Sequence, residues 1–123
     1  MKYHSEITGW GIEAMQFLTE ADLNCIIIFN DGVPPELADM AVLHKPAPIL
    51  ADFAAGDMLS ICGKVFTISA IGSEVRHTLK ELGHCTLSFK GGSTPERPGC
   101  IMLEGEEALT PADFTIGTAI EVF

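Results

Sequence analysis

His44 is the residue of this chain with the clearest capacity for chemistry. It follows an apolar run at residues 40–43, and Pro46 and Pro48 come soon after it. Because proline has no amide hydrogen to donate within a sheet, we expect the strand to end here. His44 would then lie at the exposed end of the strand, within reach of another molecule. A neutral imidazole nitrogen is a competent phosphoryl acceptor. The position suits a reactive histidine, and the alternative is a histidine that only terminates a strand.

His84 is the second candidate, at the start of an expected strand over residues 84–90. Successive side chains of a strand point to opposite faces, so the alternate residues from Cys85 to Phe89 form an apolar face. His84, Thr86 and Ser88 then share the polar face, which must meet water, a groove or a partner. His84 could assist His44, or it could anchor the end of the preceding helix, where histidine suits the negative end of the dipole.

Weaker candidates surround these two histidines. Lys45 could neutralise an incoming phosphate as a point charge, although an exposed lysine beside a strand end is ordinary. Thr86 could add a hydroxyl contact, although the preference of threonine for strands also explains it. A metal site built from His44, His77 and His84 is a third possibility, but the spacing matches no recognised ligand pattern. We therefore expect no metal and no cofactor.

Length and charge narrow the class of protein. A chain of 123 residues can bury one core, so we expect a single domain over residues 1–123. Lys and Arg together number 7 against 17 Asp and Glu, for a formal net charge of −10. This balance argues against nucleic acid as a partner and favours a protein partner with a basic face.

The hydropathy is high for a soluble chain but does not indicate a membrane span. Hydrophobic residues make up 47% of the sequence and the mean hydropathy is +0.30. The most apolar stretches, residues 25–29 and 49–55, are far shorter than the roughly 20 residues that a spanning helix needs. The first residues lack the apolar core of a signal peptide, so we expect a cytoplasmic protein without direct membrane insertion.

The spacing of the cysteines does not match a disulfide framework or a metal-binding motif. Cys25, Cys62, Cys85 and Cys100 are widely spaced, and there is no Cys-x-x-Cys pair. Unpaired cysteines are usually buried, so free core thiols are expected and a redox or metal role is the alternative.

The elements that must position the candidate side chains are mostly short strands. Runs rich in β-branched and aromatic residues recur between glycine-containing turns, without alternating long helices. This pattern predicts an all-β barrel or sandwich. The expected strands are residues 3–8, 23–29, 40–43, 58–62, 64–71, 84–90, 99–104 and 118–123.

One helix interrupts the strands, with a second helical turn elsewhere. Ser73 can cap its start, apolar residues follow at helical spacing, and Gly83 can adopt the left-handed conformation that ends a helix. A short turn is expected after Pro34 and Pro35, because proline is favoured at the start of a helix. Residues 11–22 have ambiguous spacing between helix and loop.

Several segments together resemble a known family. Residues 29–34 read Phe-Asn-Asp-Gly-Val-Pro, an apolar strand ends at His44, and residues 71–73 read Ile-Gly-Ser. Residues 81–89 read Glu-Leu-Gly-His-Cys-Thr-Leu-Ser-Phe and precede Pro98 and Gly99. Their order and spacing over nearly the whole chain resemble the glucitol/sorbitol-specific enzyme IIA of bacterial sugar phosphotransferase systems.

The resemblance implies a small closed or nearly closed β-barrel that acts as a phosphocarrier. Such a protein accepts a phosphoryl group from the phosphocarrier HPr and passes it to the sugar-specific IIB domain of a membrane permease with IIB and IIC components. His44 matches the histidine that is phosphorylated, through Nε2, and His84 is a possible auxiliary group. Some relatives have another polar residue where this chain has Pro46. The alternative is a noncatalytic β-barrel module that binds a small ligand or a protein.

Overall fold

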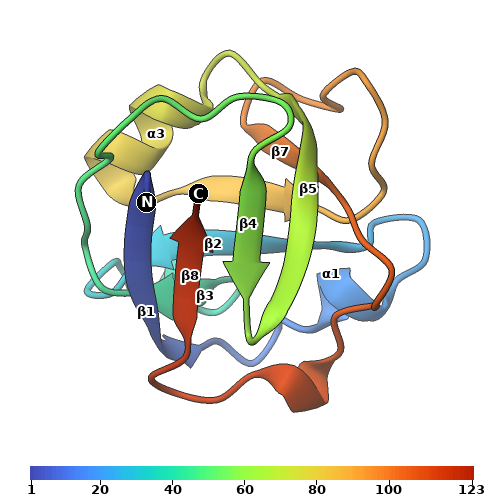
Figure 1. The fold of residues 1–123 in the computed structure, drawn as a ribbon. Helices are drawn as coiled ribbons and strands as arrows, with labels where there is room; N and C mark the ends of the chain where they lie inside the picture. Colours follow the sequence, from blue (N-terminus) through green and yellow to red (C-terminus); the bar gives the residue numbers. More distant parts are fainter.

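The computed structural model describes residues 1–123 as a closed barrel of eight strands (Figure 1). The strands are β1 Tyr3–Trp10, β2 Cys25–Asn30, β3 Val42–His44, β4 Met58–Ile61, β5 Lys64–Ile71, β6 Cys85–Ser88, β7 Cys100–Glu104 and β8 Ala119–Val122. Around the barrel they follow the order β1-β3-β2-β6-β7-β5-β4-β8, and β8 pairs with β1 to close the ring. The expected barrel is confirmed, and no strand is left with an unpaired edge.

All eight expected strands are present, with differences only at their ends. The β5 strand covers residues 64–71 as expected, and Cys62 and Gly63 form the tight turn before it with positive φ angles of 53° and 77°. Two such angles are typical of the two-residue hairpin turn that matches strand twist. The β3 strand is shorter than expected at its start and extends by one residue to include His44.

Two pairs of neighbouring strands are parallel, β2 with β3 and β6 with β7, and the others are antiparallel. The short β3 strand lies between β1 and β2. In this register His44 has Ile7 of β1 on one side and Asn30 of β2 on the other. The last residue of β3 is therefore enclosed by sheet on both sides.

The helices are short and lie outside the ring of strands. They are α1 Gln16–Thr19, α2 Pro35–Ala38 and α3 Val75–Leu82, with a 3₁₀ turn at Pro111–Asp113. The turn expected after the two prolines is α2. Figure 1 shows α3 beside one end of the barrel, and the side chains of Val75 and Leu79 are buried in the core.

The expected end of α3 is confirmed and its expected start is wrong. Gly83 follows the helix with φ 63° and ψ 24°, the left-handed conformation. At the other end Glu74, not Ser73, is the capping residue, and no side chain caps the helix. The start is held instead by backbone, because the Glu74 amide donates to the carbonyl of Pro98 and the Val75 amide to that of Gly72.

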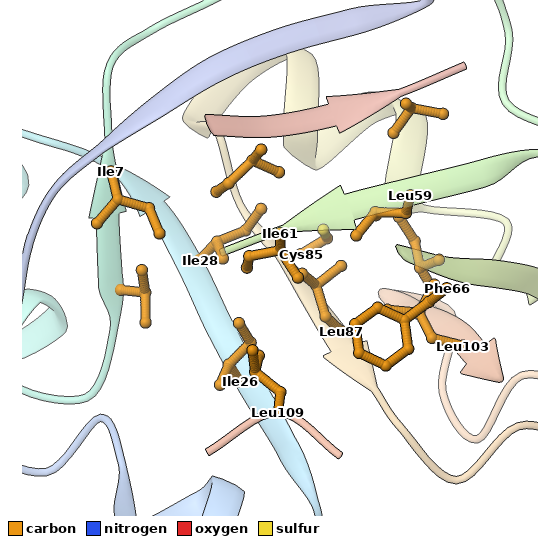
Figure 2. Packing of buried hydrophobic residues seen from close by; sticks show 14 of the residues in the cluster. Ile7, Ile26, Ile28, Leu59, Ile61, Phe66, Cys85, Leu87, Leu103 and Leu109 are labelled. Carbon is orange, nitrogen blue, oxygen red and sulfur yellow. The ribbon is translucent and has the colours of Figure 1, made fainter. Parts of the chain in front are cut away.

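The barrel interior is a single large apolar cluster (Figure 2). Ile26 and Ile28 of β2 pack in it together with Leu59 and Ile61 of β4 and with Leu87 of β6. Among the buried residues only three are polar, namely Ser5, His44 and Ser88. Buried polar groups are costly unless they are hydrogen-bonded, so the surroundings of Ser5 and His44 hold the main structural information about a site.

Candidate functional site

His44 is fully buried, and the expectation that it would be open to another molecule is wrong for this structure. Its exposed fraction is 0%. The cause is alternation along a strand that has neighbours on both sides: His44 points to the same inner face as Val42, which is also fully buried. The strand does end before the two prolines, but His44 is still part of it, and its imidazole ring points into the barrel.

The His44 ring is held at both nitrogens. Nε2 lies 2.7 Å from the carbonyl oxygen of Gly83, directly after α3. On the other side, Nδ1 lies 3.0 Å from the Ser5 hydroxyl and 2.9 Å from the carbonyl oxygen of Lys45. The Ser5 hydroxyl also donates to the Lys45 carbonyl at 2.6 Å. These contacts satisfy a polar ring inside an apolar barrel and fix its orientation.

The partners of the ring restrict where its hydrogens can be. A carbonyl oxygen only accepts, so the contact with Gly83 assigns a hydrogen to Nε2. A neutral ring then has only a lone pair at Nδ1, and the single Ser5 hydroxyl hydrogen can go to Nδ1 or to the Lys45 carbonyl, but not to both. A charged ring donates from Nδ1 and leaves the Ser5 hydrogen with the Lys45 carbonyl. In either case the Nε2 lone pair is not available in this arrangement. The observed state is a closed one.

The sequence analysis missed Ser5, which contacts the His44 ring, and it also missed Asn30. Asn30 is the last residue of β2, directly beside His44, and it continues the inward positions of Ile26 and Ile28. Its Oδ1 atom is buried and has no hydrogen-bond partner. A polar residue at the inward end of an otherwise apolar alternation was the sequence signal that could have identified it.

Tyr3 adds a buried phenol to the same end of the barrel. Its ring meets that of His44 edge to face, with centroids 6.5 Å apart. Burial raises the pKa of Tyr3 to about 12, and the hydroxyl makes no hydrogen bond of normal geometry although Ser5 is close to it. Tyr3 therefore supplies apolar packing against the imidazole and stays protonated.

His84 does not lie with its ring beside that of His44. It stacks on Phe29 with centroids 4.0 Å apart and an angle of 13° between the rings. Its Nδ1 contacts the carbonyl oxygen of Ile28 at 3.1 Å, which assigns the hydrogen to Nδ1 and leaves Nε2 with a free lone pair. The ring is partly exposed. The contact of His44 Nε2 with the Gly83 carbonyl brings His44 next to the backbone of the residue before His84.

Neither Thr86 nor Lys45 directs its side chain to the His44 imidazole. Thr86 and Ser88 line a surface cavity of about 210 Å³ together with Lys90 and Arg97. The Lys45 ammonium group is exposed and lies 3.6 Å from the carboxylate of Glu6. What Lys45 does contribute to the ring is its backbone carbonyl.

The other reactive groups do not form a second centre. No group of three or more His, Cys, Asp or Glu is arranged to hold a metal ion. All four cysteines are free; Cys85 and Cys100 are buried, and Cys25 and Cys62 are half-buried. Burial raises the pKa of each thiol, to about 12 for Cys85, so these thiols are poor nucleophiles near neutral pH. None of the helices combines the length and apolar character required to cross a bilayer.

Comparison with known proteins gives a consistent result. The family model described as "PTS system glucitol/sorbitol-specific IIA component" matches residues 2–121. The chain is 28% identical over 119 residues to the glucitol/sorbitol-specific EIIA components of Escherichia coli (strain K12) and Shigella flexneri, covering 97% of this chain and 92% of each relative. A crystal structure of a PTS system IIA component from Enterococcus faecalis V583 is similar in fold, with a TM-score of 0.74, 24% identity, and coverage of 96% of this chain and 97% of that one.

Proposed function

Because this chain belongs to the glucitol/sorbitol-specific IIA family of the bacterial phosphotransferase system, we propose that it carries a phosphoryl group on His44. In this proposal the donor is phospho-HPr and the acceptor is the IIB domain of a glucitol/sorbitol-type permease, and both reactions take place in the cytoplasm. No metal or cofactor takes part. The relay rests on a covalent phosphohistidine intermediate.

The observation that carries the choice of His44 is the burial of its ring among hydrogen-bonding groups within an apolar core. A structural residue in this position could be aliphatic, as the neighbouring Ile7 and Val42 are. An imidazole with partners at both nitrogens is held in one orientation, and in-line transfer depends on a well-positioned acceptor. This argues for a ring that is retained for its chemistry.

Transfer needs an open state, since the Gly83 carbonyl covers Nε2 in the closed one. Opening requires the turn between α3 and β6 to move away from His44. Exchange with water then moves the ring hydrogen from Nε2 to Nδ1, where the Lys45 carbonyl can accept it. The Nε2 lone pair forms the new N–P bond while the P–N bond of phospho-HPr breaks, and that electron pair stays on the HPr nitrogen.

The second half of the relay reverses the first. A cysteine thiolate of IIB attacks phosphorus, and the electron pair of the broken N–P bond returns to Nε2 of His44. HPr and IIB must approach the same ring, so their binding is expected to be mutually exclusive. The net charge of −10 favours encounter with partners that present basic faces.

A second candidate acceptor is His84, and one observation favours it. Its Nδ1 is tied to the Ile28 carbonyl, its Nε2 is free, and its ring is partly exposed without any rearrangement. Single substitutions of His44 and His84 are expected to have opposite effects on phosphorylation, depending on which histidine is the acceptor.

The test is phosphorylation of the purified chain by phosphoenolpyruvate, enzyme I and HPr. Wild type and His84→Gln are expected to gain acid-labile phosphate, whereas His44→Gln is expected to remain at background. Circular dichroism and thermal unfolding check that both variants are folded. Label that persists in folded His44→Gln and disappears in His84→Gln would transfer the role to His84. A chain that takes up no phosphate in any form would favour the noncatalytic binding module.

A further inference from the structure

We infer that Asn30 is a phosphoryl-binding residue, whose carboxamide donates hydrogen bonds to the phosphoryl group on His44. The inference rests on the proposed function of His44 and adds a residue to that site. It is carried by three observations: the register of Asn30 beside His44, the unpartnered state of its side chain, and its packing against Gly83.

The register brings the two side chains to the same face. In the parallel pair of β2 and β3, Asn30 is directly opposite His44, and residues opposite one another share a face of the sheet. His44 points into the barrel. The alternation of Ile26, Ile28 and Asn30 directs the carboxamide to that interior as well.

The Asn30 carboxamide oxygen makes no hydrogen bond that would stabilise the closed state. This is unusual for a buried oxygen in a native structure and calls for an explanation. The group has two N–H donors, and a rotation of 180° about its last bond exchanges the positions of oxygen and nitrogen. Asn30 can therefore present donors where Oδ1 now lies, without any change in the backbone.

Gly83 connects this unpartnered group to the reactive nitrogen. A Cβ atom at position 83 would collide with the carboxamide of Asn30, so the two are in direct contact. The carbonyl of the same Gly83 occupies Nε2 of His44. When this carbonyl leaves, the space beside Nε2 that a phosphoryl group must enter is bordered by the Asn30 side chain.

The chemistry of the site leaves a role for a neutral donor. Phosphoryl transfer is stabilised mainly by donors to the equatorial oxygens. The nearest cation in sequence, the ammonium group of Lys45, pairs with Glu6 outside the barrel. Asn30 forms hydrogen bonds only and takes no proton, so the bond changes at phosphorus remain those between the HPr nitrogen and His44.

The decisive variant is Asn30→Leu, which keeps the branched shape of the side chain and removes the donors. We expect transfer from phospho-HPr to slow at least about tenfold, since catalytic donors are worth that or more, and the phosphohistidine to hydrolyse faster. The midpoint of thermal unfolding should be unchanged or higher, because an unpartnered polar group has been replaced by an apolar one. Opposite directions for transfer and stability would distinguish phosphoryl binding from a structural role.

Asn30→Asp is the isosteric second variant and decides the matter if the leucine variant is unstable. A carboxylate repels the phosphoryl oxygens, so it should slow transfer more than leucine does. Thr67→Val, which removes a hydroxyl on the far strand β5, is the matched control and should transfer at the wild-type rate. Wild-type rates and phosphohistidine lifetimes in both Asn30 variants would overturn this inference alone. Absence of label in the wild type would overturn the proposed function.

Discussion

The inner side of β4 and β5 is entirely apolar, whereas that of β1, β3 and β2 carries Ser5, His44 and Asn30. We call the first the apolar wall, formed by Leu59, Ile61, Phe66 and Ile68, and the second the histidine wall. The apolar wall is held by dispersion and the hydrophobic effect, which tolerate small shifts. The histidine wall is held by directional bonds to two backbone carbonyls, which do not. Stability and chemistry are thus concentrated on different strands of one barrel.

The largest expected effect comes from the apolar wall. Ile61→Ala removes a fully buried side chain and should lower the free energy of unfolding by about 2–5 kcal/mol, through lost burial and the cavity that remains. Urea unfolding measures it. Below the transition the variant should still be phosphorylated, because His44 keeps all its partners. Val65→Ala, at a half-exposed site on the same hairpin, is the control with an expected change within about 0.5 kcal/mol.

If Ile61→Ala abolished phosphorylation while remaining folded, the separation of the two walls would be wrong. The apolar wall would then take part in positioning His44.

The next largest loss of stability is expected for a substitution at Gly83, where α3 meets the histidine wall. Gly83→Ala forces a left-handed residue to carry a Cβ, which costs about 1–2 kcal/mol, and also drives that Cβ into Asn30. Gly63→Ala is a matched control in the β4–β5 turn, with a positive φ of 77° and open space around the added atom. Equal losses of unfolding free energy in the two variants would show that the contact between Gly83 and Asn30 is not tight.

The smallest of the three effects on stability is expected from Ser5→Ala. It removes the hydroxyl that contacts Nδ1 of His44 and the Lys45 carbonyl. Those two groups lie 2.9 Å apart and can bond to each other, so the loss should be only about 0.5–1.5 kcal/mol. Urea unfolding, with the wild type as the reference, measures this loss. A clearly larger loss would show that the Lys45 carbonyl does not replace the hydroxyl as the partner of Nδ1.

The sequence predicted the strands of both walls but not the closed state of the site. Alternation and glycine turns depend on local chemistry, so β5 and the left-handed Gly83 follow directly from residue types. The burial of His44 depends on β3 having β1 on one side and β2 on the other, which only the register of the whole barrel determines. Ser5 and Asn30 were missed for the same reason, since each becomes a site residue only through neighbours that are distant in sequence.

The sequence analysis also named two side chains, those of Thr86 and Lys45, that do not contact the His44 ring. Lys45 directly follows His44, so its side chain faces the other way. Thr86 lies two residues after His84, on the side of the chain opposite the buried Cys85 and Leu87, and this side faces away from the barrel interior. Thr86 therefore lines a surface cavity, and Lys45 reaches Glu6. Closeness in sequence to a candidate histidine therefore did not predict which side chains contact the His44 ring, although the backbone carbonyl of Lys45 does contact it.

The β8 strand has a particular place in the ring, because it pairs with β1 on one side and with β4 on the other. Tyr3 of β1 is opposite Val122 of β8, and Leu59 of β4 is opposite the same residue. A chain in which β8 has not yet docked presents β1 and β4 as two unpaired edges, and such edges can pair with other chains. The docking of this one short strand therefore removes both edges in a single step.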